Sequence, residues 1–288
     1  MILPSASPVS LGFTVLAALA YAWPALRASH IGSTTARWCV GIAWLAHAGA
    51  LSIGLLAEPL RFGFAPAISV TAWLIAAIYA VESYVYPKLP TRWALSALAT
   101  AAVVLALLFP GGAMASNASV WLPWHLAMGI ACYGLFGVAV VHAWFMRRAE
   151  VRMRLAADTQ SGLPLLTLER LTYRFAAAGF ILLSATLLGG YLFGDVLYGP
   201  SKAWRWDHKT VFSVLSWFTF AALLFGRTYL GWRGRRALTF LYTGSVFLLL
   251  AYVGSRFVSE VVLDAQHEVL APVSSGTVNH LAMAHPQR

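Results

Sequence analysis

The stretch Tyr198-Gly-Pro-Ser-Lys-Ala-Trp-Arg-Trp-Asp-His-Lys-Thr210 is a short polar segment between two long apolar runs, residues 172–196 and 209–227. A helix needs about 20 apolar residues to cross a bilayer, and both runs are close to that length. A connection between two such helices requires only a turn. This connection also carries two tryptophans, an aspartate, a histidine and three cations, so it predicts a ligand-binding surface at one face of a membrane.

Apolar runs of similar length recur along the whole chain. They cover residues 8–26, 38–58, 66–86, 93–109, 123–146, 172–196, 209–227 and 237–257. The chain has 288 residues, of which 60% are hydrophobic and 10% are charged, whereas a soluble domain has about 25% charged residues. The sequence therefore predicts an all-α, polytopic membrane bundle of about eight transmembrane helices.

Lysine and arginine are distributed unevenly among the connections between these runs. Fourteen lie in or beside the odd-numbered connections and four in or beside the even-numbered ones. Cations near helix ends mark the cytoplasmic side of a membrane protein, so both termini and the Trp-rich segment (residues 198–210) are predicted to face outward. The net charge of +10 reflects this topology, and we expect no nucleic-acid partner.

The predicted domain organisation is simple. Residues 1–258 are expected to form one transmembrane domain, and residues 259–288 a polar, disordered external tail. No basic segment precedes the first apolar run, which favours a retained helix over a cleaved signal peptide. Cys39 and Cys132 lie within apolar runs and are interpreted as small apolar side chains.

The Trp-rich segment suits a flat, anionic and partly apolar ligand, and haem has these properties. Trp204 and Trp206 share a face if the segment is extended, and two indoles can form a stacking wall for a porphyrin. Lys202 and Arg205 can pair with propionates through charge-assisted hydrogen bonds. The alternative is an aromatic belt at the membrane interface.

Two histidines are candidate haem-iron ligands, because neutral imidazole is a common axial ligand. His125 opens the fifth run on the same outer side as the Trp-rich segment, although an interfacial histidine would lie there too. His47 lies about nine residues into the second run, roughly 14 Å deep. An ionisable group at that depth is a functional candidate, and the alternative is a neutral imidazole that bonds a neighbouring helix.

Four other polar residues have weaker functional interpretations. His208 is a possible second outer ligand or a polar residue at a helix start, and Asp207 is placed to cap the helix that follows. His142 lies 17 residues after His125, about 25 Å along the helix. It is interpreted as an interfacial histidine near the inner surface, and the alternative is a functional residue of an inner-side site, together with His47. Glu82 is either a proton or cation site or an interfacial carboxylate.

With these residues identified, the chain resembles the cytochrome c assembly protein family of multi-pass membrane proteins, in particular its CcsA-related, YpjD-like branch. The resemblance extends over about residues 1–263. The stretches that carry it are Ala43-Trp-Leu-Ala-His-Ala48, Trp124-His-Leu-Ala-Met-Gly-Ile-Ala-Cys-Tyr-Gly-Leu-Phe136, Pro164-Leu-Leu-Thr-Leu-Glu-Arg-Leu171, Trp206-Asp-His-Lys-Thr-Val-Phe-Ser-Val-Leu-Ser-Trp217, Gly231-Trp-Arg-Gly-Arg-Arg236 and Ala251-Tyr-Val-Gly-Ser-Arg256.

The resemblance implies a membrane protein that binds haem and presents it outside for attachment to apocytochrome c. It matches Trp204, Trp206 and Asp207 to the end of a Trp-rich haem-cradling motif, His125 to an outer ligand and His47 to an intramembrane ligand. The Trp-rich segment is shorter than in full haem-attachment members, and no histidine occurs within the last two runs beyond His208. The chain therefore either binds haem with fewer ligands or keeps the fold without the chemistry.

Two function classes follow, together with a plainer structural one. The first is a haem-binding factor of cytochrome c biogenesis, working with apocytochrome c and other assembly proteins, with no catalytic residues of its own. The second is an accessory or regulatory membrane subunit of an ion transporter, in which Glu82 and His47 line a polar path. The plainer interpretation is a scaffold that docks partners through its outer loops.

Overall fold

The apolar runs form long helices in the computed structural model, which describes residues 7–27, 32–56, 61–85, 93–113, 119, 121–154, 165–198 and 206–258. The helices are α1 (Pro8–Leu26), α2 (Ser33–Leu55), α3 (Phe64–Val85), α4 (Trp93–Leu108), α5 (Leu122–Arg154), α6 (Leu165–Leu192), α7 (Gly194–Tyr198), α8 (His208–Tyr229), α9 (Gly234–Leu249) and α10 (Ser255–Phe257). A π-helical segment, η1 (Leu250–Gly254), joins α9 to α10. The predicted tail, residues 259–288, lies outside the described residues, so its boundary with the membrane domain stays a prediction.

The all-α membrane bundle is confirmed. Within the part of the chain that the structure describes, six helices are long and apolar enough to span a bilayer: α1, α3, α5, α6, α8, and α9 with its continuation to Phe257. The shorter α4 and the histidine-bearing α2 complete the bundle, so the predicted count of eight spans is approximate. Large apolar side chains such as Leu19, Ile181 and Phe218 are exposed, as expected for helix faces in contact with lipid.

Several helix boundaries differ from the prediction. The second helix begins at Ser33 instead of 38, the fifth continues to Arg154 instead of 146, and the sixth covers Leu165–Leu192 instead of 172–196. Hydropathy identifies only the part of a helix that suits the hydrocarbon core. The extra turns are rich in polar and charged residues, and they extend the same helices beyond that core.

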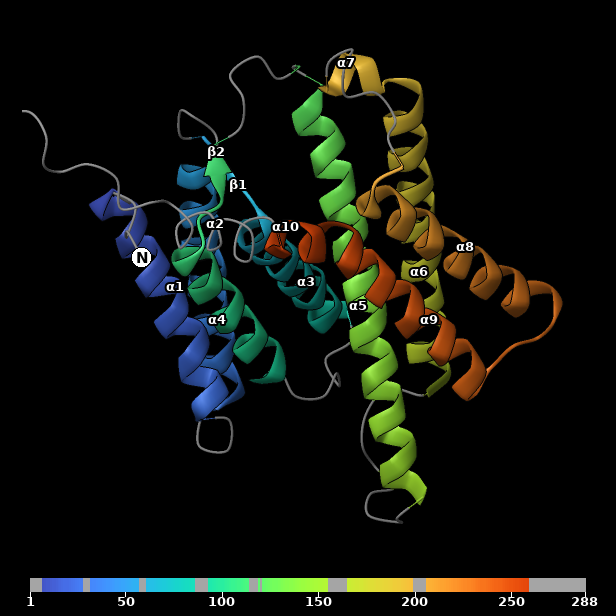
Figure 1. Ribbon diagram of the computed structural model, residues 1–288. Helices are drawn as coiled ribbons and strands as arrows, with labels where there is room; N and C mark the ends of the chain where they lie inside the picture. Colours follow the sequence, from blue (N-terminus) through green and yellow to red (C-terminus); the bar gives the residue numbers. More distant parts are fainter. Residues whose placement is uncertain are drawn as a thin grey trace, which may run out of the picture.

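The helices form two groups that meet at α3 (Figure 1). Helices α1, α2 and α4 pack around small buried residues, among them Ala17, Ala43 and Ala99. Helices α5, α6, α8 and α9 share a larger core in which the rings of Phe136 and Phe220 stack with centroids 3.7 Å apart. Helix α3 contacts α2 and α4 on one side and α5 and η1 on the other, so it forms the boundary between the groups.

A short antiparallel pairing of β1 (Arg61–Phe62) with β2 (Gly112–Ala113) joins the connection after α2 to the connection after α4. The turn before β2 requires glycine at position 111. Its φ is +80°, and a Cβ there would lie 2.6 Å from the carbonyl carbon of Phe62. Because the two connections are pinned together, Phe62 reaches the ring of Tyr252 in η1, with centroids 6.1 Å apart.

Near the last turn of α8, one arginine contacts α6 and the connection to α9. One guanidinium nitrogen of Arg227 lies 2.7 Å from a carboxylate oxygen of Glu169 in α6. The same guanidinium lies 3.8 Å from the ring centroid of Tyr173 and donates to the carbonyl of Trp232 at 3.3 Å. One cation thus ties α6, α8 and the connection to α9 at the predicted cytoplasmic side.

Candidate functional site

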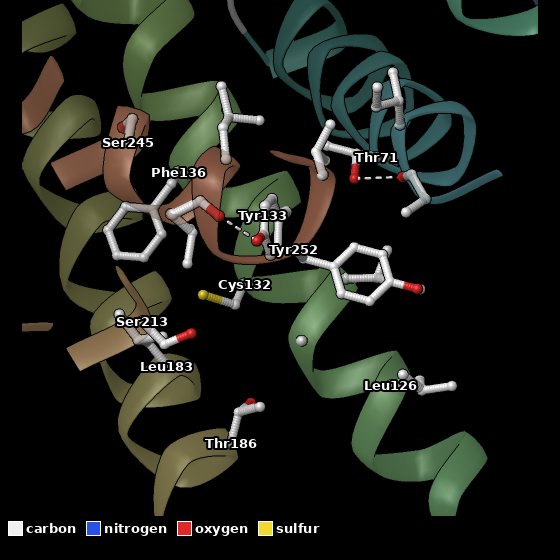
Figure 2. Close-up of a pocket in the computed structure, with 18 of the residues that line it drawn as sticks. Thr71, Leu126, Cys132, Tyr133, Phe136, Leu183, Thr186, Ser213, Ser245 and Tyr252 are labelled. Atoms are coloured by element: carbon white, nitrogen blue, oxygen red, sulfur yellow. Dashed lines mark hydrogen bonds between the residues drawn. The ribbon is translucent and has the colours of Figure 1, made fainter. Parts of the chain in front are cut away.

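A partly open cavity of about 370 Å³ lies where α3, α5, α6, α8, α9 and η1 converge. Figure 2 shows Cys132, Tyr133 and Phe136 of α5 around it, with Thr71 of α3 and Tyr252 of η1 on the other side. Its volume is within the range of small-molecule sites, about 300–1,000 Å³. The wall is mainly apolar with a few polar groups, which is the composition expected of a pocket for a largely apolar ligand.

His125, the first candidate ligand, lines this cavity from the first turn of α5. Its imidazole is half-buried and lies against α6 where that helix carries Gly189 and Gly190. A Cβ at Gly189 would be 3.7 Å from Nδ1, and one at Gly190 would be 3.5 Å from Cε1. Because these two residues have no side chains, the imidazole of His125 can pack close to the backbone of α6.

A tyrosine with two cations beside it lies at the same cavity. Lys209, in the first turn of α8, and Tyr252 of η1 both line the wall. The ammonium of Lys209 lies 5.7 Å from the Tyr252 ring centroid, and the guanidinium carbon of Arg256 in α10 lies 5.9 Å from it. The lysine charge also acts on His125. Positive charge therefore accumulates beside the candidate iron ligand.

The π-helical segment shapes the opposite wall. π-Helical turns are rare and often occur at functional sites, and this one places Tyr252 at the cavity. The hydroxyl of Tyr133 in α5 donates a hydrogen bond to the carbonyl of Leu248, two residues before the segment (Figure 2). A hydroxyl from a different helix thus fixes the end of α9 against α5.

Asp207 is the N-cap of α8, as the sequence predicted. Its carboxylate accepts a hydrogen bond from the backbone N–H of Thr210 at 2.9 Å. Partial burial raises the pKa of this carboxyl, but the hydrogen bonds from Thr210 and the charges of Lys209 and His208 outweigh that effect, and the pKa lies below its ordinary value. The carboxylate is thus ionised at neutral pH, where it supports the positive end of the helix.

Replacement of Asp207 by alanine is expected to lower the stability of the protein by about 1 kcal/mol, the usual cost of losing an N-cap. Asparagine keeps the acceptor oxygen, so Asp207→Asn should stay close to the wild type at neutral pH. The pKa of Asp207 is lower in the folded protein than in the unfolded chain, where it is about 3.9. The stabilising contribution of the carboxylate is therefore complete above the pKa of the unfolded chain and is lost as the pH falls through the pKa of the folded protein. Thermal unfolding in detergent at pH 7 and pH 3 measures both effects, and equal melting points for the Ala and Asn variants at pH 7 would rule out the capping role.

The rest of the Trp-rich segment is only partly described. Trp206 and His208 are exposed beside the start of α8. Lys202, Trp204 and Arg205 lie outside the described residues, so their predicted roles in stacking and propionate pairing stay predictions.

His47 is deeply buried, but it does not line the cavity that holds His125. Its Nε2 lies 2.8 Å from the hydroxyl oxygen of Ser69 in α3, and its ring meets that of Tyr21 in α1 edge-on, with centroids 5.9 Å apart. This is the bond to a neighbouring helix that the sequence left as the alternative. The imidazole Nδ1 has no hydrogen-bond partner among the described residues, so His47 remains a separate candidate.

The interpretation of His142 as an interfacial residue is wrong. Its side chain is fully buried and packs against Phe175 of α6, with ring centroids 5.6 Å apart. The physical reason is that α5 continues for three further turns, to Arg154, and carries the helix end away from His142. Glu82 lies in α3, and its side chain is outside what the structure describes.

Sequence reasoning missed several residues of the cavity wall. Cys132 was interpreted only as a small apolar residue, yet it is buried in the wall and its sulfur is drawn toward the cavity in Figure 2. Tyr133 and Tyr252 lie within stretches that carry the family resemblance. Nothing in those stretches, or at the Gly189-Gly190 pair, marks these residues as parts of a cavity wall. One signal was present for Cys132: it lies seven residues after His125, two helical turns on, and therefore on the same face of α5.

Comparisons with known proteins agree on one family. The profile described as Cytochrome C assembly protein matches residues 39–263. The "Inner membrane protein YpjD" of Escherichia coli (strain K12) is 30% identical over 140 residues, 48% of this chain and 52% of that protein. The "Cytochrome c biogenesis protein CcsA" of Gloeobacter violaceus is 35% identical over 94 residues, 33% of this chain and 27% of that protein.

A third relative is similar over most of its length. It is the "Uncharacterized 28.8 kDa protein in nifR3-like 5'region" of Azospirillum brasilense, 31% identical over 255 residues, 85% of this chain and 87% of that protein. The chain spans about half the length of the YpjD proteins it matches. No solved structure shows a significant match to it.

Proposed function

Because the chain belongs to the cytochrome c assembly protein family, we propose that it acts in cytochrome c biogenesis as a haem-binding protein that presents or delivers haem at the outer face of the membrane. It is a multi-pass inner-membrane protein, as its relatives and the six helices of spanning length among its described residues indicate. The outer face is the one assigned by the distribution of lysine and arginine. The single observation that carries the proposal is the position of His125 in the cavity wall.

The residues around the cavity fit a haem. An imidazole in the wall of a mainly apolar pocket can ligate iron, and the same wall has aromatic side chains, including Tyr133, Phe136 and Tyr252. A bound haem would supply an iron that can take an imidazole nitrogen as a ligand. His125 would hold the iron, the rings of the wall would pack on the porphyrin, and cations at the cavity would pair with its carboxylates.

The outer residues of the Trp-rich segment extend this proposal toward the partner. Trp206 is exposed beside the first turn of α8, where it can stack on a porphyrin edge that protrudes from the pocket. Trp204, Lys202 and Arg205 are proposed to add to this surface, with His208 as a possible second ligand. Thioether formation needs thiols of an apocytochrome c, so we propose that the protein works with that partner and with other assembly proteins.

An absorption spectrum of the detergent-purified protein, oxidised and reduced and with haem added, tests the proposal. A Soret band that sharpens and shifts from that of free haem, and that saturates at one haem per protein, is the expected result. The parallel test in cells is the amount of haem-stained c-type cytochromes in a strain that lacks the gene, which should fall. An unaltered spectrum of free haem after incubation with folded protein would rule the proposal out.

A further inference from the structure

The cavity extends along α5 well beyond the surroundings of His125. Its lining residues on this helix run from His125 to Val141, which are 16 residues apart, about 24 Å of helical rise. Figure 2 shows part of this succession, from Leu126 through Cys132 and Tyr133 to Phe136. A volume of about 370 Å³ spread over that length describes a narrow, elongated space. A porphyrin held at His125 would occupy only its outer part.

The chemistry of the wall changes along this length. The polar lining residues Lys209 and Ser213 belong to the first two turns of α8, at the predicted outer face. The part of the wall farther from that face, which we call the inner arm, is lined only by residues without a polar side chain. They are Ile75 of α3, Leu98 of α4, and Phe136, Gly137, Val140 and Val141 of α5.

The inner arm meets the bilayer at Leu98. This residue lines the cavity, yet its side chain is 47% exposed, so it lies at an opening. Leu98 is five residues into the apolar helix α4, about 7.5 Å from its start, and an exposed leucine at that depth of a membrane bundle faces lipid chains. Phe136, in contrast, is only 1% exposed. The arm therefore leads from a lipid-facing residue to a buried aromatic ring.

The walls of α3 and α5 approach each other closely at the inner arm. Gly137 has no side chain, and a Cβ there would lie 2.6 Å from Cδ1 of Ile75. The side chain of Ile75 thus lies against the backbone of α5, and the space beside it is narrow. A flexible hydrocarbon chain suits such a space better than a flat ring does, and burial of its methylene groups favours binding.

We propose that the inner arm binds one acyl chain of a membrane phospholipid, which enters from the bilayer past Leu98. In the predicted topology α4 begins at the cytoplasmic face, so the lipid belongs to the inner leaflet and its head group stays at that interface. A phospholipid fits better than a soluble ligand, because the opening faces lipid and the six lining residues of the arm have no polar side chain. The inference goes beyond the proposed function and does not depend on haem.

A photoreactive lipid tests the proposal. The purified full-length protein, without added haem, is placed in phosphatidylcholine nanodiscs that contain a phosphatidylethanolamine with a diazirine at the end of one acyl chain. After illumination, labelled residues are identified by mass spectrometry. Phe136 and Val140 are expected to carry label, and a buried residue such as Phe136 is reached only from within the arm. Ile181 of α6 is 68% exposed and serves as the reference for labelling by the surrounding lipid.

Three controls accompany this measurement. Ala139 is fully buried on the same helix but does not line the cavity, so it should stay unlabelled. Val140→Phe places a ring where at least two methylene groups of the chain would lie, and should lower the ratio of label at Phe136 to label at Ile181 by roughly tenfold. Val15→Phe makes the same substitution at an exposed position of α1 that does not line the cavity, and should leave that ratio unchanged.

The outcomes decide the proposal separately from haem binding. Label at Ile181 without label at Phe136 and Val140 overturns it, and so does label at Ala139 or a ratio that Val140→Phe leaves unchanged. If Val140→Phe does not fold, the wild-type pattern still decides. Suppression of the label by a long-chain isoprenoid alcohol, but not by excess unlabelled phospholipid, overturns the acyl chain as the occupant. Labelling of the arm in a protein that gives no haem spectrum supports the inner arm and removes only the haem proposal.

Discussion

His125→Ala is expected to abolish the shifted Soret band of the haem-loaded protein and to weaken haem binding by at least about 100-fold. Loss of a residue that only hydrogen-bonds to a metal ligand already weakens metal binding by up to about 100-fold, and loss of the ligand itself should cost at least as much. The imidazole lines the cavity from the first turn of α5, and alanine leaves no atom there that can ligate iron. The cavity itself stays, because its walls come from several helices. Titration of the purified variant with haem, followed by absorbance, measures the change.

Two controls separate ligation from folding. Free imidazole added to His125→Ala should enter the space left by the side chain and restore the band, because it supplies the missing nitrogen without a covalent link. The melting temperature should differ little from that of the wild type, since the wild-type imidazole is only half-buried. A variant spectrum that is identical to the wild type would assign the iron ligand to another residue, and His208→Ala and His47→Ala would then be measured in turn.

The second large effect is expected in stability, from Gly226→Ala near the end of α8. A Cβ at this position would lie 2.3 Å from Cε3 of Trp232. The indole cannot easily move away, because it packs against Phe240, with centroids 4.8 Å apart, and against Arg236. Overpacking of this kind costs about 1–3 kcal/mol. At about 2–4 °C per kcal/mol for a chain of this size, the variant should melt several degrees below the wild type.

Gly12→Ala in α1 is the matched control, because a Cβ there meets no atom within 4 Å. A glycine in an open helical position is less favourable than alanine by about 1 kcal/mol, so this variant should melt at or slightly above the wild-type temperature. Combining Gly226→Ala with Trp232→Leu should cost less than the sum of the two single changes, since the clash is removed. Strict additivity would show that the overlap with the indole is not the cause.

Features encoded locally could be predicted from the sequence. Long apolar runs predicted the helices because crossing a bilayer requires that length. The carboxylate of Asp207, immediately before an apolar run, predicted the N-cap because the contact spans only three residues. The place of His125 in the first turn of its helix followed from the same kind of argument.

Features that depend on distant segments could not be predicted. Tyr252 and Lys209 are in contact although 43 residues separate them in the sequence. The hydroxyl of Tyr133 donates a hydrogen bond to the carbonyl of Leu248, which lies 115 residues further along the chain. In both cases, nothing in the sequence around one residue specifies the other. The error at His142 has the same origin. Hydropathy ended the helix near residue 146, whereas the charged turns that follow remain helical, and α6 covers the histidine.

The cavity lies at the boundary between the two groups of helices, with α3 on one side and α5, α6, α8 and η1 on the other. A ligand that contacts both groups links them to each other. Its binding free energy opposes separation of the groups. At a free ligand concentration of a hundred times the dissociation constant, binding adds about 2.7 kcal/mol to the free energy needed to separate them. The two groups of helices are then expected to separate less readily in the loaded protein than in the empty one, so a membrane protease that attacks local openings would distinguish the two forms without contacting the ligand.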